Sequence, residues 1–175
     1  MAVFILSLGS NQGDRLQHLQ NSISELKLIG KIQGISSVYQ SESWGFDDDK
    51  FYNIVLLWTP NQELRPHEAL RAFQNIETKL GRQEKSSEKY ESRPIDIDII
   101  SIDEQRIDSP DLQIPHSLFS QRNFVLLPLA ELKSDFIHPK TKETIIKLIN
   151  NYGQFTFIND FDGLEPYPTF VHSNE

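Results

Sequence analysis

The chain contains no cysteine among its 175 residues. This absence excludes disulfide frameworks, cysteine-ligated zinc, iron–sulfur clusters and thiol nucleophiles, and it is compatible with a reducing compartment. Long apolar runs are also missing, because none approaches the roughly 18 residues that a membrane span needs. Residues 1–8 lack a basic leader and a sustained apolar core. We therefore expect a cytoplasmic protein with no membrane partner.

Basic residues are scarce relative to acidic ones: 17 Lys and Arg stand against 25 Asp and Glu, which gives a net charge of −8. This sign opposes nonspecific binding to nucleic acid, so nucleic acid is not an expected partner. Any phosphate chemistry must then depend on a local basic patch. The hydrophobic fraction of 38% and the low glycine and proline content are typical of a globular chain whose length suits one domain.

The order of predicted elements indicates the fold class. Apolar and β-branched runs predict strands over 3–8, 35–39, 51–59 and 95–102, with a short hairpin near 106–107. Apolar residues at helical spacing predict helices from an Asp14 cap to Gly30 and from Pro66 to Gly81. The resulting βαββαβ order is that of the ferredoxin-like α+β fold: an antiparallel sheet with helices on one face and the other face open.

Further elements follow this core. Residues 121–132 are predicted to be helical around Pro128, and Thr141 is predicted to cap a last helix that ends at Gly153. We assign residues 1–159 to one domain and 160–175 to an acidic C-terminal tail.

The segment from Ile95 to Ile99 alternates isoleucine with Asp96 and Asp98. Residues two apart on a strand share a face, so both carboxylates project together while the isoleucines enter the core. A divalent cation such as Mg²⁺ would relieve the repulsion between the carboxylates. Simple alternation on a solvated sheet face is the other interpretation, and spacing alone leaves both open.

Basic residues precede this carboxylate pair. The segment 79–93 carries five Lys and Arg, including Arg82 and Arg93, against three Glu. A polyphosphate needs both signs nearby, because Mg²⁺ bridges its oxygens and arginine stabilises developing charge. A solvated loop of mixed charge is the competing interpretation.

Several polar and aromatic side chains could bind a planar ligand. Asn53 lies within an otherwise apolar strand, where a buried amide must either satisfy backbone groups or bind the polar edge of a ligand. Trp44, Phe51 and Phe124 could stack on a flat ring, although aromatic residues are more often part of the core. His116 with Arg122 could bind phosphate or simply lie at the surface.

Taken together, these motifs resemble the 6-hydroxymethyl-7,8-dihydropterin pyrophosphokinases of folate biosynthesis. The resemblance spans most of the chain and rests on residues 8–14 (LGSNQGD), 42–46 (ESWGF), 51–53 (FYN), 81–82 (GR), 93–98 (RPIDID), 115–116 (PH) and 122–124 (RNF). It implies a magnesium-dependent, ATP-binding kinase that transfers a whole diphosphate to the pterin hydroxymethyl group and releases AMP. The length leaves no room for a second enzyme domain of the pathway, so we expect a monofunctional protein, and we expect it to be monomeric.

The resemblance further implies roles for individual residues. Asp96 and Asp98 would bind two Mg²⁺ ions, and Arg82 and Arg93 would hold the transferred phosphates. The side chains implied on the ATP side are Gln74, Glu77, Lys85, Lys89, His116 and Arg122. Those implied around the pterin are Ser41, Trp44, Phe51, Asn53 and Phe124.

Three other interpretations share this element order. An RNA-binding domain would need a basic, aromatic sheet, which an acidic chain without an RNP1-like strand does not favour. A palm-like, metal-dependent nucleotidyltransferase would use the same paired aspartates but would release pyrophosphate. A non-enzymatic, ferredoxin-like ligand-binding module would bind ligands without turnover.

Overall fold

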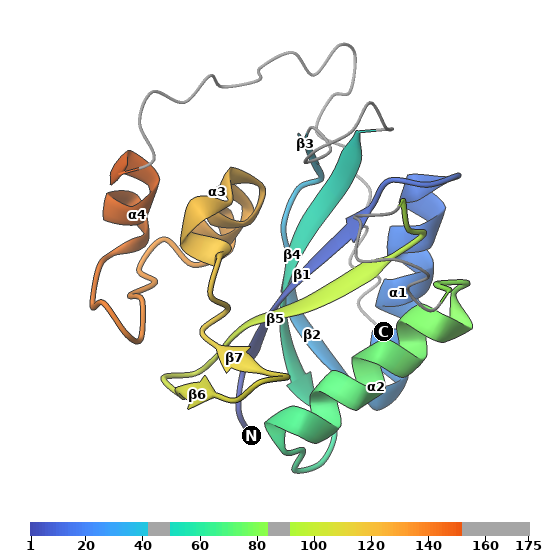
Figure 1. Cartoon of the computed structure of the whole chain (residues 1–175), viewed down its shortest axis with the longest axis horizontal. Helices are drawn as coiled ribbons and strands as arrows, with labels where there is room; N and C mark the ends of the chain where they lie inside the picture. The colour runs from blue at the N-terminus through green and yellow to red at the C-terminus, as the bar shows by residue number, and fades with distance from the viewer. Residues whose placement is uncertain (42–49, 84–91, 152–175) are drawn as a thin grey trace.

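The computed structural model describes residues 1–41, 50–83 and 92–151 (Figure 1). Its main sheet is antiparallel and has the strand order β2-β4-β1-β5, with the short strand β3 also paired to β4. The strands are β1 (Phe4–Ser10), β2 (Gly30–Ile35), β3 (Tyr39–Ser41), β4 (Phe51–Pro60) and β5 (Asp96–Ile102). This order confirms the predicted ferredoxin-like class.

Helices α1 (Arg15–Ile29) and α2 (Pro66–Lys79) cover one face of the sheet (Figure 1). Both predicted start signals are confirmed: Asp14 accepts a hydrogen bond from the Gln17 backbone nitrogen at 3.0 Å, and Pro66 opens α2. The core between these helices and the sheet includes the fully buried Leu6, Leu19, Ile54, Trp58 and Phe73.

The opposite face of the sheet is partly covered rather than open. Helices α3 (Asn123–Leu132) and α4 (Ile145–Asn151) lie on that side (Figure 1) and form a second core with Ile5, Val55 and Ile100. These three strand residues alternate with the residues of the first core, so β1, β4 and β5 are buried on both faces. Only one end of this face is left for a site.

The predicted strand over 35–39 is wrong. Helix α1 instead passes directly into β2 at Gly30, and β2 ends at Ile35. Ser36 then takes over the pairing with β4: its backbone nitrogen donates to the Val55 carbonyl at 3.0 Å, and its hydroxyl accepts from the Val55 nitrogen at 2.9 Å. The side chain thus replaces a backbone partner and separates β2 from β3.

The remaining elements follow β5. Strands β6 (Ile107–Asp108) and β7 (Gln113–Ile114) pair with each other in a separate two-stranded sheet, so Ile107 does not return along β5 as predicted. A 3₁₀ turn spans Phe119–Gln121. Thr144, rather than the predicted Thr141, caps α4 by accepting from the Lys147 nitrogen at 3.3 Å. In the part of the chain that the structure describes, no helix is long and apolar enough to cross a membrane. Residues 152–159 and the predicted tail 160–175 lie outside the described ranges.

Candidate active site

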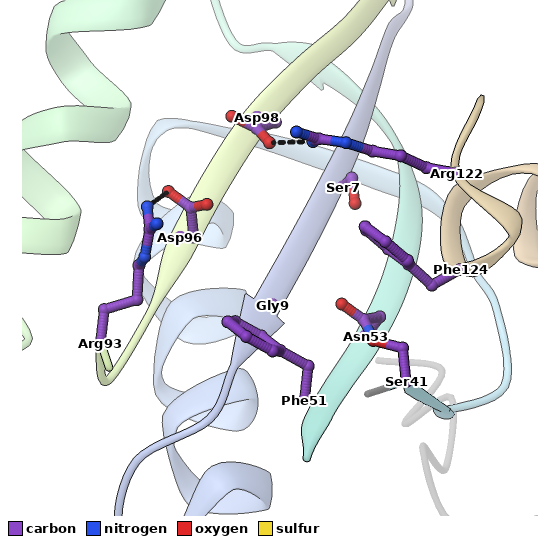
Figure 2. Close-up of a pocket in the computed structure, with 10 residues that line it drawn as sticks. All are labelled: Ser7, Gly9, Ser41, Phe51, Asn53, Arg93, Asp96, Asp98, Arg122 and Phe124. Atoms are coloured by element: carbon purple, nitrogen blue, oxygen red, sulfur yellow. Dashed lines mark hydrogen bonds and ion pairs between the residues drawn. The ribbon is translucent and has the colours of Figure 1, made fainter. Parts of the chain in front are cut away.

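Strand β5 carries the paired carboxylates on the face opposite α1 and α2. Asp96 pairs with Gly9 of β1 and Asp98 with Ser7, whereas Ile97, between them, is buried in the first core. The predicted alternation is therefore confirmed, and both carboxylates emerge at the end of the sheet that α3 leaves uncovered (Figure 2).

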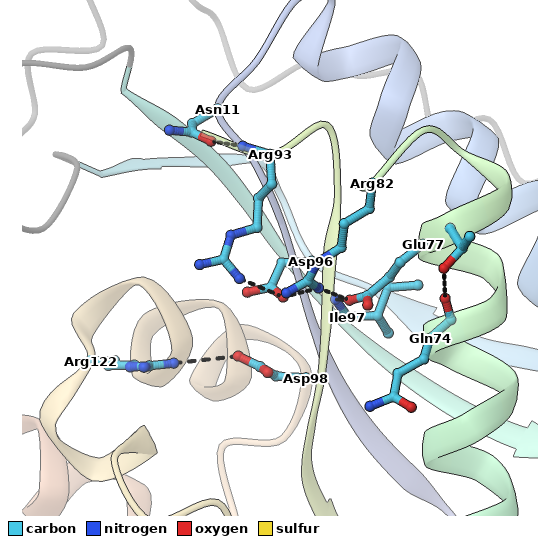
Figure 3. Close-up of polar contacts among 10 residues, drawn as sticks. Asn11, Gln74, Glu77, Arg82, Arg93, Asp96, Ile97, Asp98 and Arg122 are labelled. Carbon is cyan, nitrogen blue, oxygen red and sulfur yellow. Dashed lines mark hydrogen bonds and ion pairs between the residues drawn. The ribbon is translucent and has the colours of Figure 1, made fainter. Parts of the chain in front are cut away.

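Three arginines surround these carboxylates (Figure 3). Arg82, just beyond α2, and Arg93, just before β5, contact Asp96 Oδ1 with terminal guanidinium nitrogens at 2.7 and 3.1 Å. Arg122, before α3, contacts Asp98 Oδ2 at 3.4 Å. Three separate segments of the chain thus bring positive charge to one strand of an acidic protein, as the predicted basic patch requires.

Gly81 explains how Arg82 reaches this position. Its φ of +98° lies in the left-handed region that favours glycine, and it turns the chain out of α2 toward β5. The Arg82 backbone nitrogen also donates to the Glu77 carbonyl at 3.0 Å, which fixes the turn.

Glu77 projects from α2 beneath the carboxylate pair and is only 5% exposed. Its carboxylate accepts from the Ile97 backbone nitrogen at 2.6 Å and contacts the Arg82 guanidinium at 2.6 Å. Burial, followed by the charge of Asp96, raises the pKa of Glu77 to about 7, while Arg82 opposes the shift. Burial and the charge of Asp96 likewise raise the pKa of Asp98 to about 6, while the charges of the three arginines oppose this shift.

A pocket adjoins the carboxylates on the same sheet face (Figure 2). The Asn53 side chain is 2% exposed, and its amide nitrogen donates to Ser41 Oγ at 2.9 Å and to the Tyr39 carbonyl at 3.3 Å. Both donor bonds turn the amide nitrogen toward β3 and direct Oδ1 the other way, over Gly9. The lining residues are Ser7, Gly9, Ser41, Phe51, Asn53, Arg93, Asp96, Asp98, Arg122 and Phe124.

The two aromatic walls of this pocket come from different elements. Phe51 opens β4, and Phe124 lies in the first turn of α3, so the rings reach the cavity from the sheet and from the helix (Figure 2). The Arg122 guanidinium lies 5.8 Å from the centre of the Phe124 ring. Arg122 therefore faces both the carboxylates and the aromatic wall.

A second hollow lies on the α2 side of the carboxylates. It is lined by Leu70, Gln74, Glu77, Thr78, Arg82, Gln83, Asp96, Ile97 and Asp98. Asp96 and Asp98 border both cavities, so the paired carboxylates stand between two adjacent binding spaces.

His116 follows the β6–β7 hairpin and lines neither cavity, although the charges of Arg122 and Asp96 act on its ring. Burial and the charge of Arg122 lower the pKa of His116 to about 4, so its ring is neutral at pH 7. Its Nδ1 accepts from the Leu118 nitrogen at 3.2 Å. The neutral tautomer consistent with this bond carries its proton on Nε2.

Most of the predicted site residues are thus brought together. The structure gathers Ser41, Phe51, Asn53, Gln74, Glu77, Arg82, Arg93, Asp96, Asp98, Arg122 and Phe124 around two adjoining cavities. Trp44, Lys85 and Lys89 lie outside the described residues.

Sequence reasoning gave no role to Asn11, although its side chain is buried against the site. Asn11 Oδ1 accepts from the Arg93 nitrogen at 2.9 Å, and its Nδ2 donates to Ser92 Oγ at 3.3 Å. The available signal was a polar residue directly after a buried strand, within a motif that could also be a simple turn. The partner lies too far along the chain to be found from spacing.

The carboxylates and arginines of this α+β sheet lie between an aromatic pocket and a second, polar hollow. This arrangement is typical of a class of enzymes, the phosphate-group transferases, with a small planar acceptor. Comparison with known proteins specifies the family. The family model described as 7,8-dihydro-6-hydroxymethylpterin-pyrophosphokinase (HPPK) matches residues 5–134, and the chain belongs to this family. Members carry out ATP-dependent pyrophosphoryl transfer to hydroxymethyldihydropterin in folate biosynthesis, as the sequence resemblance implied.

Individual relatives agree with this assignment. The chain is 37% identical to 2-amino-4-hydroxy-6-hydroxymethyldihydropteridine pyrophosphokinase of Aquifex aeolicus over 79% of this chain and 85% of the relative. It is 39% identical to the protein of the same name from Porphyromonas gingivalis over 80% of this chain and 96% of the relative.

Solved structures support the fold. A Plasmodium falciparum HPPK-DHPS triple mutant superposes with a TM-score of 0.68 at 16% identity, covering 86% of this chain. The match spans 43% of that longer protein, so less than half of its length has a counterpart here.

Proposed function

We propose that the chain carries out diphosphate transfer from ATP to 6-hydroxymethyl-7,8-dihydropterin through the residues described above. The observation that carries this assignment is a single cavity lined by both the paired carboxylates and the buried Asn53 amide. A phosphate-transfer centre and a space for a flat polar ring thereby adjoin each other. This arrangement suits a reaction in which the acceptor hydroxyl must lie in line with the ATP phosphates.

Asp96 and Asp98 are proposed to hold two Mg²⁺ ions. Their donor set fits, because Mg²⁺ binds one or two protein carboxylates and takes its other ligands from water and substrate phosphates. In the described ranges, no cluster of three or more His, Cys, Asp or Glu side chains offers an all-protein site. Bound Mg²⁺ would supply charge neutralisation at the phosphates and make the acceptor hydroxyl more acidic.

Arg82 and Arg93 are proposed to hold the transferred phosphates. Both guanidinium groups lie on one oxygen of Asp96, and phosphate oxygens could take over these charge-assisted hydrogen bonds. During transfer, the bond between the acceptor oxygen and the β-phosphorus forms while the bond from that phosphorus to the AMP oxygen breaks. Fixed arginines can stabilise the charge that moves onto the departing AMP.

The pterin is proposed to lie between Phe51 and Phe124. Stacking between two aromatic rings suits a flat heterocycle, and Asn53 can bind its polar edge because Ser41 already fixes the amide nitrogen. The backbone near Trp44 belongs to this proposal but lies outside the described residues.

ATP is proposed to occupy the second hollow. Gln74 and Glu77 line it, and Arg122 and His116 lie beyond the carboxylates, where the neutral His116 ring offers Nε2–H as a donor. Lys85 and Lys89 are also proposed to contact ATP, but both lie outside the described ranges. We further propose that the chain acts in the cytoplasm as a monomer and does not bind nucleic acid. Its net charge of −8 opposes contact with nucleic acid, and its lack of cysteine is compatible with a reducing compartment.

The test is product analysis with purified protein, ATP, Mg²⁺ and 6-hydroxymethyl-7,8-dihydropterin, with omission of pterin and addition of EDTA as controls. Pterin-dependent AMP without an equivalent amount of free pyrophosphate is expected. ADP would indicate transfer of a single phosphate, and pyrophosphate would indicate nucleotidyl transfer. Persistence of turnover in EDTA would contradict the magnesium assignment.

A further inference from the structure

A carboxylate outside both cavities connects the two sides of the aromatic pocket. Glu131 lies near the end of α3 and reaches across to the segment that leads into β3. Its Oε1 accepts from the Ser37 backbone nitrogen at 2.9 Å and from the Ser37 hydroxyl at 3.0 Å. Its Oε2 accepts from the Tyr39 hydroxyl at 3.0 Å. Both oxygens are therefore bonded to the same short segment.

The strand that follows this segment depends on such an anchor. β3 has only three residues, and its pairing with β4 is confined to Tyr39, Gln40 and Ser41. No second strand pairs with β3 in the described ranges. A short edge strand gains little stability from its ladder alone, so side-chain bonds to α3 contribute a large share of its order.

β3 in turn fixes the amide in the pocket. The carbonyl of Tyr39 and the hydroxyl of Ser41 are the two acceptors for the Asn53 amide nitrogen, at 3.3 and 2.9 Å. Tyr39 thus bonds Glu131 through its side chain and Asn53 through its backbone. A shift of β3 would release the amide and allow it to rotate away from the geometry that presents Oδ1 to the pocket.

The same helix supplies the aromatic wall. Phe124 precedes Glu131 by seven residues on α3, which is about two helical turns, so both side chains lie on the same side of the helix. The bonds of Glu131 therefore tie the element that carries Phe124 to the strand that holds Asn53. Burial and the charge of Glu131 raise the pKa of Tyr39 to about 12, which agrees with a close, charge-assisted bond.

We infer that Glu131 is a positioning residue for the pterin: it sets the distance and orientation between Phe124 and the Ser41–Asn53 pair without touching the ligand. The inference rests on the proposed function, because it takes the aromatic pocket to be the pterin site. Specificity for the acceptor ring then depends in part on the surface contact of Glu131 with Ser37 and Tyr39, behind the pocket.

The test compares Glu131→Gln and Glu131→Ala with the wild-type chain. We expect Glu131→Ala to raise the KM for the pterin about tenfold, with KM for ATP changed less than twofold, since a binding loss equal to about one charge-assisted hydrogen bond corresponds to that factor. Glu131→Gln retains one acceptor oxygen and should show a smaller rise. Glu143→Gln, which removes an ion pair with Lys147 on α4, is the matched control and should leave both KM values unchanged.

A double-mutant cycle separates positioning from general loosening. If Glu131 acts through the amide, Glu131→Ala should have little further effect on pterin KM in an Asn53→Ala background. Equal increases of both KM values, or full additivity with Asn53→Ala, would overturn the inference. If Asn53→Ala itself leaves the pterin KM unchanged, the proposed pterin site fails. A change with Asn53→Ala but none with Glu131→Ala refutes the positioning role alone.

Discussion

Asn11 and Arg93 are joined through both backbone and side chain, although 82 residues separate them in sequence. The Arg93 nitrogen donates to Asn11 Oδ1 at 2.9 Å, and the Asn11 nitrogen donates to the Arg93 carbonyl at 3.3 Å. The end of β1 therefore holds the backbone of a proposed phosphate-binding arginine. The Asn11 side chain is 3% exposed, so its partners cannot readily be replaced by water.

Replacing Asn11 with alanine should lower both stability and turnover. The change removes the Asn11 acceptor from the partly buried Arg93 nitrogen, at an expected cost of about 1–3 kcal/mol in the free energy of unfolding. Turnover should fall about tenfold because the arginine loses its fixed position. Urea unfolding and steady-state kinetics would measure the two effects. Asn21→Ala, which removes an exposed side-chain hydrogen bond with Gln17 on α1, is the control. Wild-type stability in Asn11→Ala would contradict the account.

Asp98→Ala should abolish most turnover while the fold is preserved. The pKa of Asp98, raised from 3.8 to about 6, means that folding destabilises its ionised form relative to the unfolded chain, so this carboxylate does not contribute to stability at neutral pH. We expect a thermal unfolding midpoint equal to or above that of the wild-type chain, together with loss of AMP formation. Asp108→Ala, on β6, should retain activity. Near-normal turnover in Asp98→Ala would remove the proposed metal ligand.

Asn53→Ala should weaken pterin binding far more than ATP binding. The amide lies among the aromatic walls of the first pocket and is absent from the lining of the second. Loss of its hydrogen bonds would leave polar groups of the ligand unpaired, which corresponds to about 10- to 100-fold in the dissociation constant. Titration calorimetry with each ligand separately would measure the difference. Equal weakening of both ligands would argue against the assignment.

Glu77 should make the unliganded protein less stable as the pH rises. Its folded pKa of about 7 lies above the ordinary value of 4.5, so the folded state holds this proton more tightly than the unfolded chain does. The contribution is fully present below pH 4.5 and is lost as the pH passes through 7. Glu77→Gln should therefore be more stable than wild type at pH 8, by about 1–3 kcal/mol, and nearly equal at pH 5. A difference that does not vary with pH would refute this explanation.

Gly30→Ala should be strongly destabilising. A Cβ atom at Gly30 would lie 2.2 Å from Cε2 of Trp58, which is fully buried in the first core and cannot move aside. We expect a loss of about 2–3 kcal/mol, measured by urea unfolding. Gly34→Ala on the same strand is the matched control, since its nearest contact would be an ordinary 3.5 Å to Leu132. Equal losses of stability in the two variants would show that the strand propensity of alanine and glycine, rather than the clash with Trp58, determines the effect.

Sequence patterns predicted those features of the fold that depend only on neighbouring residues in the chain. The Asp14 cap, Pro66 at the start of α2 and the alternation around Asp96 each lie within one element, and the structure confirms all three. The break between β2 and β3 could not be predicted, because the Ser36 hydroxyl takes a ladder position opposite Val55, which a propensity argument does not detect. Asn11 is similar, since its role depends on a partner from a distant segment.

The residue-level site was predictable only in part. Spacing alone placed Asp96 and Asp98 on one face, whereas the grouping of Asn53 with Phe51 and Phe124 came from family resemblance. Glu131 was not predicted at all. Its function depends on three hydrogen bonds to a segment more than 90 residues earlier in the chain.

The seven residues of β5 contribute both to the site and to the core. In its first half, which is paired with β1, alternate positions supply Asp96 and Asp98 on one face and the buried Ile97 and Ile99 on the other. Inserting or deleting a single residue at its start would exchange the two faces. The aspartates would then enter the hydrophobic core, and the isoleucines would face the cavity. A change in length before this strand is therefore tolerable only where Arg93 and Asp96 keep their places, since a shift of the strand by one residue would cost the carboxylate pair and the first core together.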